Sequence, residues 1–207
     1  SINLDDENTH QGFVISHHGG EVEVQPGAAE TTNIHCKLRT NLGVIVCGDQ
    51  VFYRQENNDL SIIALHPRRN LLQRMDGFGQ LKAVAANVTQ LLICLAIEPE
   101  PNLFLLDQYL LSAEQQQIDV IIVLNKIDLA DKNDSDPFQL KAIYQPLGYE
   151  VLPVSIIDHI NIEILQQHCV SHVNVISGVS GVGKSSITKA ILPEVEIPIG
   201  EISEVNR

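Results

Sequence analysis

The sequence lacks any hydrophobic run close to the roughly 20 apolar residues that a membrane-spanning helix needs. Its first ten residues, SINLDDENTH, lack the basic and apolar zones of a signal peptide. The four cysteines lie far apart and show no CxxC or comparable zinc spacing, and the histidines show no metal spacing either. We therefore expect reduced thiols buried in apolar surroundings, no membrane association and a cytoplasmic location.

Basic residues are scarce, with 13 Lys+Arg against 26 Asp+Glu and a net charge of −13. Residues 1–80 carry −4 and residues 81–207 carry −9. This balance argues against nucleic-acid binding through bulk electrostatics, which needs a basic face. Arg68, Arg69 and Arg74 form the one candidate cluster for a local RNA contact, and scattered solvated arginines explain them equally well.

The first part of the chain is predicted to be all β. After a polar, acidic tail at residues 1–8, which we expect to be disordered, GFVIS (12–16) and EVEVQ (21–25) flank a turn signal and predict a hairpin. IHCKLR alternates, so that Ile34, Cys36 and Leu38 share one face. Five or so short strands without a helix predict an OB-fold-like barrel over residues 9–79, followed by a linker, DGFGQLK, at 76–82.

The second part alternates apolar strands with helices. Strands are predicted at 91–97, 120–125, 151–155 and 173–177, and helices at 102–117, 137–147, 159–170 and 184–192. Asn102 is the expected cap of the first helix, with Leu103, Leu106, Leu110 and Leu111 along one stripe. The pattern predicts an α/β domain over residues 83–207, with a parallel sheet covered on both faces.

Residues 178–185, GVSGVGKS, satisfy the phosphate-loop pattern G-x-x-x-x-G-K-[ST] at every position, between a predicted strand and a predicted helix. Glycines let successive N–H groups converge on an anion, and the following helix directs its positive end to the same point. Lys184 would contact the β- and γ-phosphates, and the Ser185 hydroxyl would ligate Mg²⁺. The alternative is a glycine-rich turn that opens a helix.

Asn125, Lys126, Ile127 and Asp128 form an NKxD motif where a predicted strand meets a loop. A carboxylate at Asp128 can accept hydrogen bonds from N1–H and the exocyclic amine of guanine, whereas adenine presents an acceptor and a C–H there. Lys126 can lay its stem along the base, and Asn125 can tie this loop to the phosphate loop. Ser155 and the N–H of Ile156, after the next strand, are candidates for a contact with guanine O6. The alternatives are a polar turn with Asp128 as a helix cap, and a plain strand end at Ser155.

The NKxD motif precedes the phosphate loop, the reverse of the order in ordinary nucleotide switches. Joining the chain ends of such a domain and cutting it before its fourth strand gives this order. The first switch and the DxxG motif should then follow the last predicted helix, but residues 193–207 contain neither. We expect the sequence to be a fragment or its remainder not to be represented.

These ordered motifs resemble the RsgA (YjeQ) family of circularly permuted ribosome-biogenesis GTPases. The resemblance rests on the barrel-like N-terminal part, VAANV at 84–88, NKID, VS at 154–155, and GVSGVGKSS running into GEIS at 200–203, and covers nearly the whole chain after residue 10. It implies an OB-fold, a permuted GTPase domain and a C-terminal zinc-binding domain. It also implies binding to the small (30S) ribosomal subunit, its 16S rRNA and its proteins, late in maturation, with GTP hydrolysis stimulated by the subunit.

By this resemblance, GTP or GDP and Mg²⁺ are the cofactors, Lys184 and Ser185 are catalytic, and a monomer is expected. Asn125, Lys126, Ile127 and Asp128 would recognise guanine together with Ser155 and Ile156. The phosphates would be held by Gly178, Val179, Ser180, Gly181, Val182, Gly183, Lys184, Ser185 and Ser186. The family's zinc ligands, both switches and its basic N-terminal extension are not in this sequence, so zinc binding, switching and efficient hydrolysis are not expected of this stretch alone.

Three other functions remain open at this point. The chain could be mainly a ribosome-binding module in which nucleotide stabilises the second domain. It could be another permuted assembly GTPase, acting on the large subunit, although such proteins usually lack an N-terminal barrel of this kind. In an adenine-specific P-loop kinase or ATPase, the NKxD motif would be a coincidence.

Overall fold

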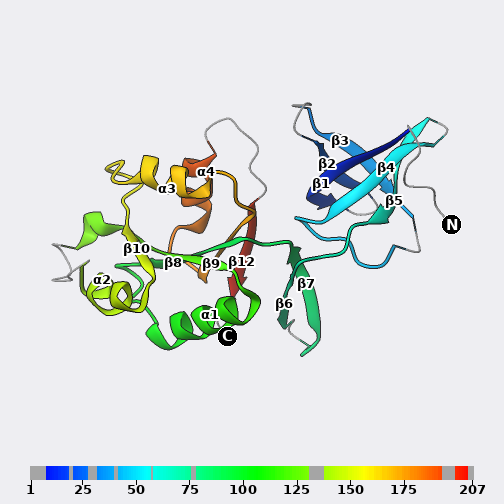
Figure 1. The fold of residues 1–207 in the computed structure, drawn as a ribbon. Helices are drawn as coiled ribbons and strands as arrows, with labels where there is room; N and C mark the ends of the chain where they lie inside the picture. The colour runs from blue at the N-terminus through cyan, green and yellow to red at the C-terminus, as the bar shows by residue number, and fades with distance from the viewer. Residues whose placement is uncertain are drawn as a thin grey trace. The chain divides into compact units, whose positions relative to one another are not determined.

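The computed structural model forms two compact units, Ser1–Val88 and Thr89–Arg207 (Figure 1). The residues that the structure describes are 8–18, 21–27, 32–39, 42–56, 58–75, 78–130, 138–192 and 199–204. The predicted acidic tail, apart from Asn8, lies outside these ranges.

The first unit contains a closed barrel with strand order β1-β2-β3-β5-β4, which confirms the predicted barrel. Its strands are β1 (Thr9–His18), β2 (Glu21–Pro26), β3 (Ile34–Leu38), β4 (Gln50–Glu56) and β5 (Asp59–Leu65). The predicted hairpin is β1 with β2, paired from Gly12 opposite Pro26 to His18 opposite Glu21 with a shift of register between Val14 and Ser16. Alternate residues point inward because side chains on a strand have a period of two, so Val22, Val24 and Cys36 are buried in the barrel core.

An ion pair between a buried carboxylate and a partly exposed guanidinium closes the loop before β4. Asp49 is fully buried and accepts hydrogen bonds from Arg68 Nε at 2.7 Å, Arg68 Nη2 at 2.8 Å and the backbone N–H of Val46 at 2.9 Å. The guanidinium therefore has a structural role. Arg68, one member of the predicted cluster with Arg69 and Arg74, is therefore not free to contact RNA.

Replacing Arg68 by Ala is expected to destabilise the barrel by about 3 kcal/mol, because Asp49 would remain as a buried charge without its partner. Denaturant unfolding of the 207-residue chain measures the effect. Arg69→Ala is the matched control, since the Arg69 side chain is exposed and the change removes the same group one residue on. Equal stability of the two variants would show that the pair with Asp49 contributes little.

A second hairpin, β6 (Leu71–Met75) with β7 (Leu81–Ala86), follows the barrel. The sequence did not predict it, and the expected linker at 76–82 instead includes the start of β7. The Asn87 side-chain amide donates to Gly48 O at 2.9 Å, and that of Asn70 donates to Val88 O at 2.8 Å. These amides tie the end of the hairpin into the first unit, so the boundary between the units falls later than predicted, at Val88–Thr89.

The second unit has a five-stranded, all-parallel sheet in the order β10-β9-β8-β11-β12. The strands are β8 (Gln90–Ala96), β9 (Asp119–Asn125), β10 (Glu150–Pro153), β11 (Asn174–Val179) and β12 (Ile199–Glu204), the last of which was not predicted. The helices are α1 (Leu103–Gln116), α2 (Phe138–Tyr144), α3 (Ile162–Cys169) and α4 (Lys184–Ile191). Figure 1 shows α3 and α4 on one face of this sheet and α1 on the other, which confirms the predicted α/β architecture.

Helix α1 begins as predicted, because the Asn102 side chain accepts a hydrogen bond from Leu105 N at 3.1 Å. The predicted leucine stripe is only half right. Leu106 and Leu110 are buried, whereas Leu103 is 40% and Leu111 62% exposed. The buried face continues to Ala113, the position one further turn along from Leu110, so the stripe that meets the sheet is narrower than predicted.

The cysteines are free thiols, and three of them, Cys36, Cys94 and Cys169, are buried, as predicted. Burial raises the pKa of the Cys36 and Cys169 thiols to about 11, so both stay protonated at neutral pH. Within the described ranges, no cluster of three or more His, Cys, Asp or Glu side chains could hold a metal ion. No helix in those ranges has the length and hydropathy needed to cross a membrane.

Candidate nucleotide-binding site

The phosphate loop, residues 178–185, joins β11 to α4 at the carboxyl end of the sheet. Its three glycines have φ values of 148° at Gly178, 88° at Gly181 and 94° at Gly183, which other residues rarely adopt. A Cβ at Gly178 would lie 2.3 Å from Cys94 O, and one at Gly183 would lie 2.4 Å from Asn125 Nδ2. The loop therefore needs glycine both for its backbone angles and for its close contact with the neighbouring strands.

Lys184 is 8% exposed, and its Nζ donates to the carbonyls of Gly178 at 2.8 Å and Val179 at 3.0 Å. These bonds hold the ammonium inside the curve of the phosphate loop, where it can meet phosphate oxygens. Ser185 and Ser186 are exposed in the first turn of α4. The first N–H groups of a helix lack intrahelical partners and attract anions, so this end of α4 offers donors, positive potential and two accessible hydroxyls.

Asn125, at the end of β9, joins the NKxD loop to the phosphate loop. Its side chain is 3% exposed, and Nδ2 donates to Val182 O at 2.9 Å. Its Oδ1 is buried and has no hydrogen-bond partner among the described residues. An unpaired buried acceptor is costly, so a donor from a bound ligand would relieve it.

Asp128 is held by the loop that follows β10. Ser155 is fully buried, and its Oγ donates to Asp128 Oδ1 at 2.7 Å and accepts from Asp158 N at 3.1 Å. The backbone N–H of Ser155 donates to Ile160 O at 3.3 Å, so it is engaged within the loop, while Ile156 is half-buried beside it. Ser155 therefore orients the Asp128 carboxylate, a role that the sequence did not predict.

The geometry argues against Asp128 as a helix cap. Asp128 lies inside the short 3-10 turn Ile127–Leu129, and the cap position belongs to Lys126, which has a left-handed φ of 62°. The Asp128 carboxylate accepts a hydrogen bond from Ser155 on the next loop, whereas the carboxylate of a helix cap would accept one from a backbone N–H of its own turn. One Asp128 oxygen is thus fixed by Ser155, and this half-buried group can accept from a ligand.

Lys126 makes a contact that the sequence did not predict. Its Nζ donates to the backbone carbonyl of Glu98 at 2.8 Å, on the β8–α1 loop, residues 97–102. The sequence offered one usable signal for this loop. It follows a buried strand of a parallel sheet, and ligands bind at the carboxyl ends of such strands.

These residues fit a nucleotide with Mg²⁺. In the phosphate loop a side chain at Gly178 or Gly183 would clash, and Asn125 presents a buried acceptor with no partner among the residues that the structure describes. Asp128 and Lys184 belong to two loops that the contact between Asn125 and Val182 joins. For Mg²⁺, the chain supplies the exposed hydroxyl of Ser185 at the start of α4.

The fold and the site define a P-loop nucleotide-binding domain of the GTPase type, in permuted order and preceded by a closed barrel. The family model for the RsgA GTPase matches residues 65–207. The chain therefore belongs to the RsgA GTPase family.

Curated relatives named "Small ribosomal subunit biogenesis GTPase RsgA" include that of Pseudomonas savastanoi pv. phaseolicola, which is 42% identical over 199 residues. The alignment covers 94% of this chain and 58% of the relative, so the chain spans little more than half the length of the proteins it matches. The crystal structure of YjeQ from Thermotoga maritima has a TM-score of 0.74 at 30% identity, covering 91% of this chain and 66% of that one. YloQ, described as a circularly permuted GTPase, has a TM-score of 0.69 at 26% identity and covers 93% of this chain and 68% of that one.

Proposed function

We propose that this chain binds GTP and GDP with Mg²⁺ and acts, as part of a GTP-hydrolysing factor, in late maturation of the small ribosomal subunit. The observation that carries the nucleotide proposal is the bond from Asn125 Nδ2 to Val182 O, because it joins a guanine-type recognition loop to a phosphate loop. The relatives' name, small ribosomal subunit biogenesis GTPase, supports the cellular role.

In this proposal each part of the site has a distinct task. Asp128, oriented by Ser155, accepts two hydrogen bonds from guanine, and the stem of Lys126 lies along the base. The backbone N–H groups of the phosphate loop and Lys184 neutralise the phosphates, and Ser185 holds Mg²⁺. Catalysis of phosphoryl transfer then depends on positioning and on stabilising the charge around the γ-phosphate.

The proposed partners are 16S rRNA and proteins of the small subunit, which the protein would bind as a monomer in the cytoplasm. Several barrel cations already pair with carboxylates, among them Lys37 with Asp59 and Arg68 with Asp49. Arg39 and Arg54 both pair with Glu56. These pairs favour ribosomal protein, or a few local contacts, over a broad phosphate-binding surface on the barrel.

Co-sedimentation tests the partner. The 207-residue chain, loaded with a non-hydrolysable GTP analogue, is expected to sediment with purified small subunits more than with large subunits, and less when loaded with GDP. Binding to the large subunit alone would favour a different assembly GTPase. Binding to small subunits that does not depend on nucleotide would favour a module in which nucleotide is only structural.

A further inference from the structure

Three features of the β8–α1 loop place it between the two halves of the site. Its first residue, Ile97, donates from its backbone N–H to Asn125 O at 3.1 Å. The backbone carbonyl of the following residue, Glu98, accepts a hydrogen bond from Lys126 Nζ at 2.8 Å. A Cβ added at Gly181 would lie 3.8 Å from Cδ of Pro99, so the proline ring lies opposite the phosphate loop across a space that one added carbon would fill.

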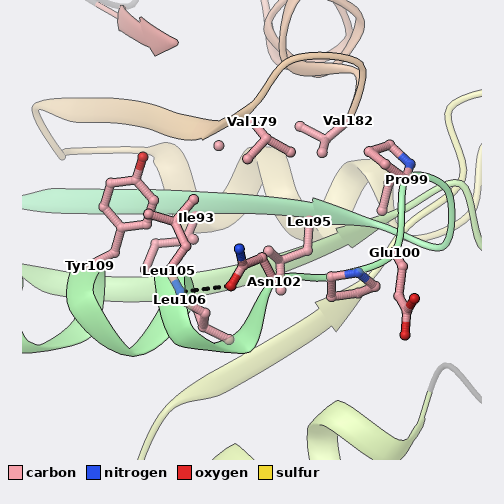
Figure 2. A pocket seen from close by; sticks show the side chains of 13 residues that line it. Ile93, Leu95, Pro99, Glu100, Asn102, Leu105, Leu106, Tyr109, Val179 and Val182 are labelled. Atoms are coloured by element: carbon pink, nitrogen blue, oxygen red, sulfur yellow. Dashed lines mark hydrogen bonds between the residues drawn. The ribbon is translucent and has the colours of Figure 1, made fainter. Parts of the chain in front are cut away.

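The loop and the phosphate loop also line one small pocket, of about 10 Å³. Pro99 and Pro101 line it from the β8–α1 loop, and Gly178, Val179 and Val182 line it from the phosphate loop. Figure 2 shows Pro99 beside Val182, with the Glu100 side chain directed away from both. The proline ring, and not the neighbouring carboxylate, thus faces the phosphate loop.

We propose that Pro99 is a positioning residue for nucleotide binding, which acts through the Glu98 carbonyl and Lys126 on the base. This inference rests on the proposed nucleotide site and adds the β8–α1 loop to the segments that form it. No motif of the phosphate-loop or NKxD type includes residues 97–102.

The physical reason lies in backbone restriction. Proline fixes its own φ and lacks an N–H, so Pro99 gives the backbone next to the Glu98 carbonyl fewer conformations than another residue would. That carbonyl holds the Lys126 ammonium and thereby limits the rotamers of a long, flexible side chain. A side chain that is ordered before binding loses less entropy when the base arrives, so GDP binds more tightly.

The test is a double-mutant cycle on the 207-residue chain, with dissociation constants for a fluorescent GDP derivative. Pro99→Gly is expected to weaken binding about 3- to 10-fold, through lost preorganisation and a looser contact with Lys126. In a Lys126→Met background, which keeps the stem but removes the ammonium, the same change is expected to weaken binding less than about twofold. Pro146→Gly, the same substitution at an exposed position of the second unit that does not line this pocket, should leave GDP affinity near that of the native chain.

Melting temperatures without nucleotide separate positioning from folding. If Pro99→Gly lowers the melting temperature of the nucleotide-free chain, Pro99→Ala replaces it in the cycle. Native affinity in the Pro99 variants, or equal losses with and without the Lys126 ammonium, would overturn the inference while leaving the proposed function intact. Absence of GDP binding by the native chain would instead contradict the proposed function, and the inference with it.

Discussion

Asp128→Asn is expected to weaken GDP binding by about 100-fold and to improve binding of xanthosine diphosphate. The carboxylate accepts two hydrogen bonds from guanine in the proposed complex, and hydrogen bonds to a charged group are worth about 1.5–3 kcal/mol each. The side-chain oxygen of Asn can accept one of these hydrogen bonds, but the amide N–H groups would then face the other guanine donor. Xanthine has a carbonyl in place of the exocyclic amine, so the amide N–H gains an acceptor. Titration of both nucleotides against both proteins measures the exchange.

Asp158→Asn is the matched control, because Asp158 is exposed in the neighbouring loop and contacts Ser155 through its backbone N–H. Its nucleotide affinities should stay at native values. Equal affinity of the native chain for ADP and GDP, or native GDP affinity in Asp128→Asn, would refute guanine recognition by this loop.

Gly183→Ala is expected to reduce GDP affinity by more than about tenfold. Position 183 has a φ of 94°, and the added Cβ would lie 2.4 Å from Asn125 Nδ2. The clash separates the Asn125 amide from Val182 O, so the phosphate loop and the NKxD loop move apart. Nucleotide titration measures the loss, and a melting curve shows that the variant folds.

Gly148→Ala controls for backbone strain alone. Gly148 has a φ of 93°, and a Cβ there would meet no atom of the described residues within 4 Å. Both variants should therefore lose about 1–2 kcal/mol of stability from the left-handed backbone, and Gly183→Ala alone should lose GDP affinity. If both variants bind GDP equally well, the close packing at Gly183 does not matter for the site.

Much of the fold follows from local patterns in the sequence. Alternation placed Cys36 in the barrel core, and continuous apolar runs predicted the β8 and β9 strands of the parallel sheet. Asn102 marked the start of α1 through its own side chain. Such features depend on residues close together in the chain, so they are visible without a structure.

The errors occurred where distant residues decide the outcome. Arg68 resembled part of a basic surface cluster until the fold placed it 2.7 Å from Asp49. The glycine-bearing segment at 76–82 resembled a linker, but its last two residues, Leu81 and Lys82, pair with β6 in a hairpin. Strand β12 is defined by its pairing with β11. In this pairing Ile199 lies opposite Asn174, which is 25 positions earlier in the chain.

The site shows the same division. The spacing of NKxD and of the phosphate loop selected Asn125, Asp128 and Lys184 as candidates, because each motif is contiguous. Ser155 was selected for a different contact, since only the tertiary structure brings its hydroxyl to Asp128. Glu98 and Pro99 belong to no motif. They were identified only from the structure, in which Glu98 accepts from Lys126 and Pro99 lies opposite Gly181.

The central claim is that one guanine nucleotide spans the NKxD loop and the phosphate loop. A crystal structure of the 207-residue chain with GDP and Mg²⁺ tests it most directly. We predict the guanine edge at the Asp128 carboxylate and the β-phosphate among the N–H groups of residues 178–185, with Lys184 Nζ on a phosphate oxygen and Ser185 Oγ on the metal. A base directed away from Asp128, or a nucleotide bound elsewhere on the chain, would contradict the account.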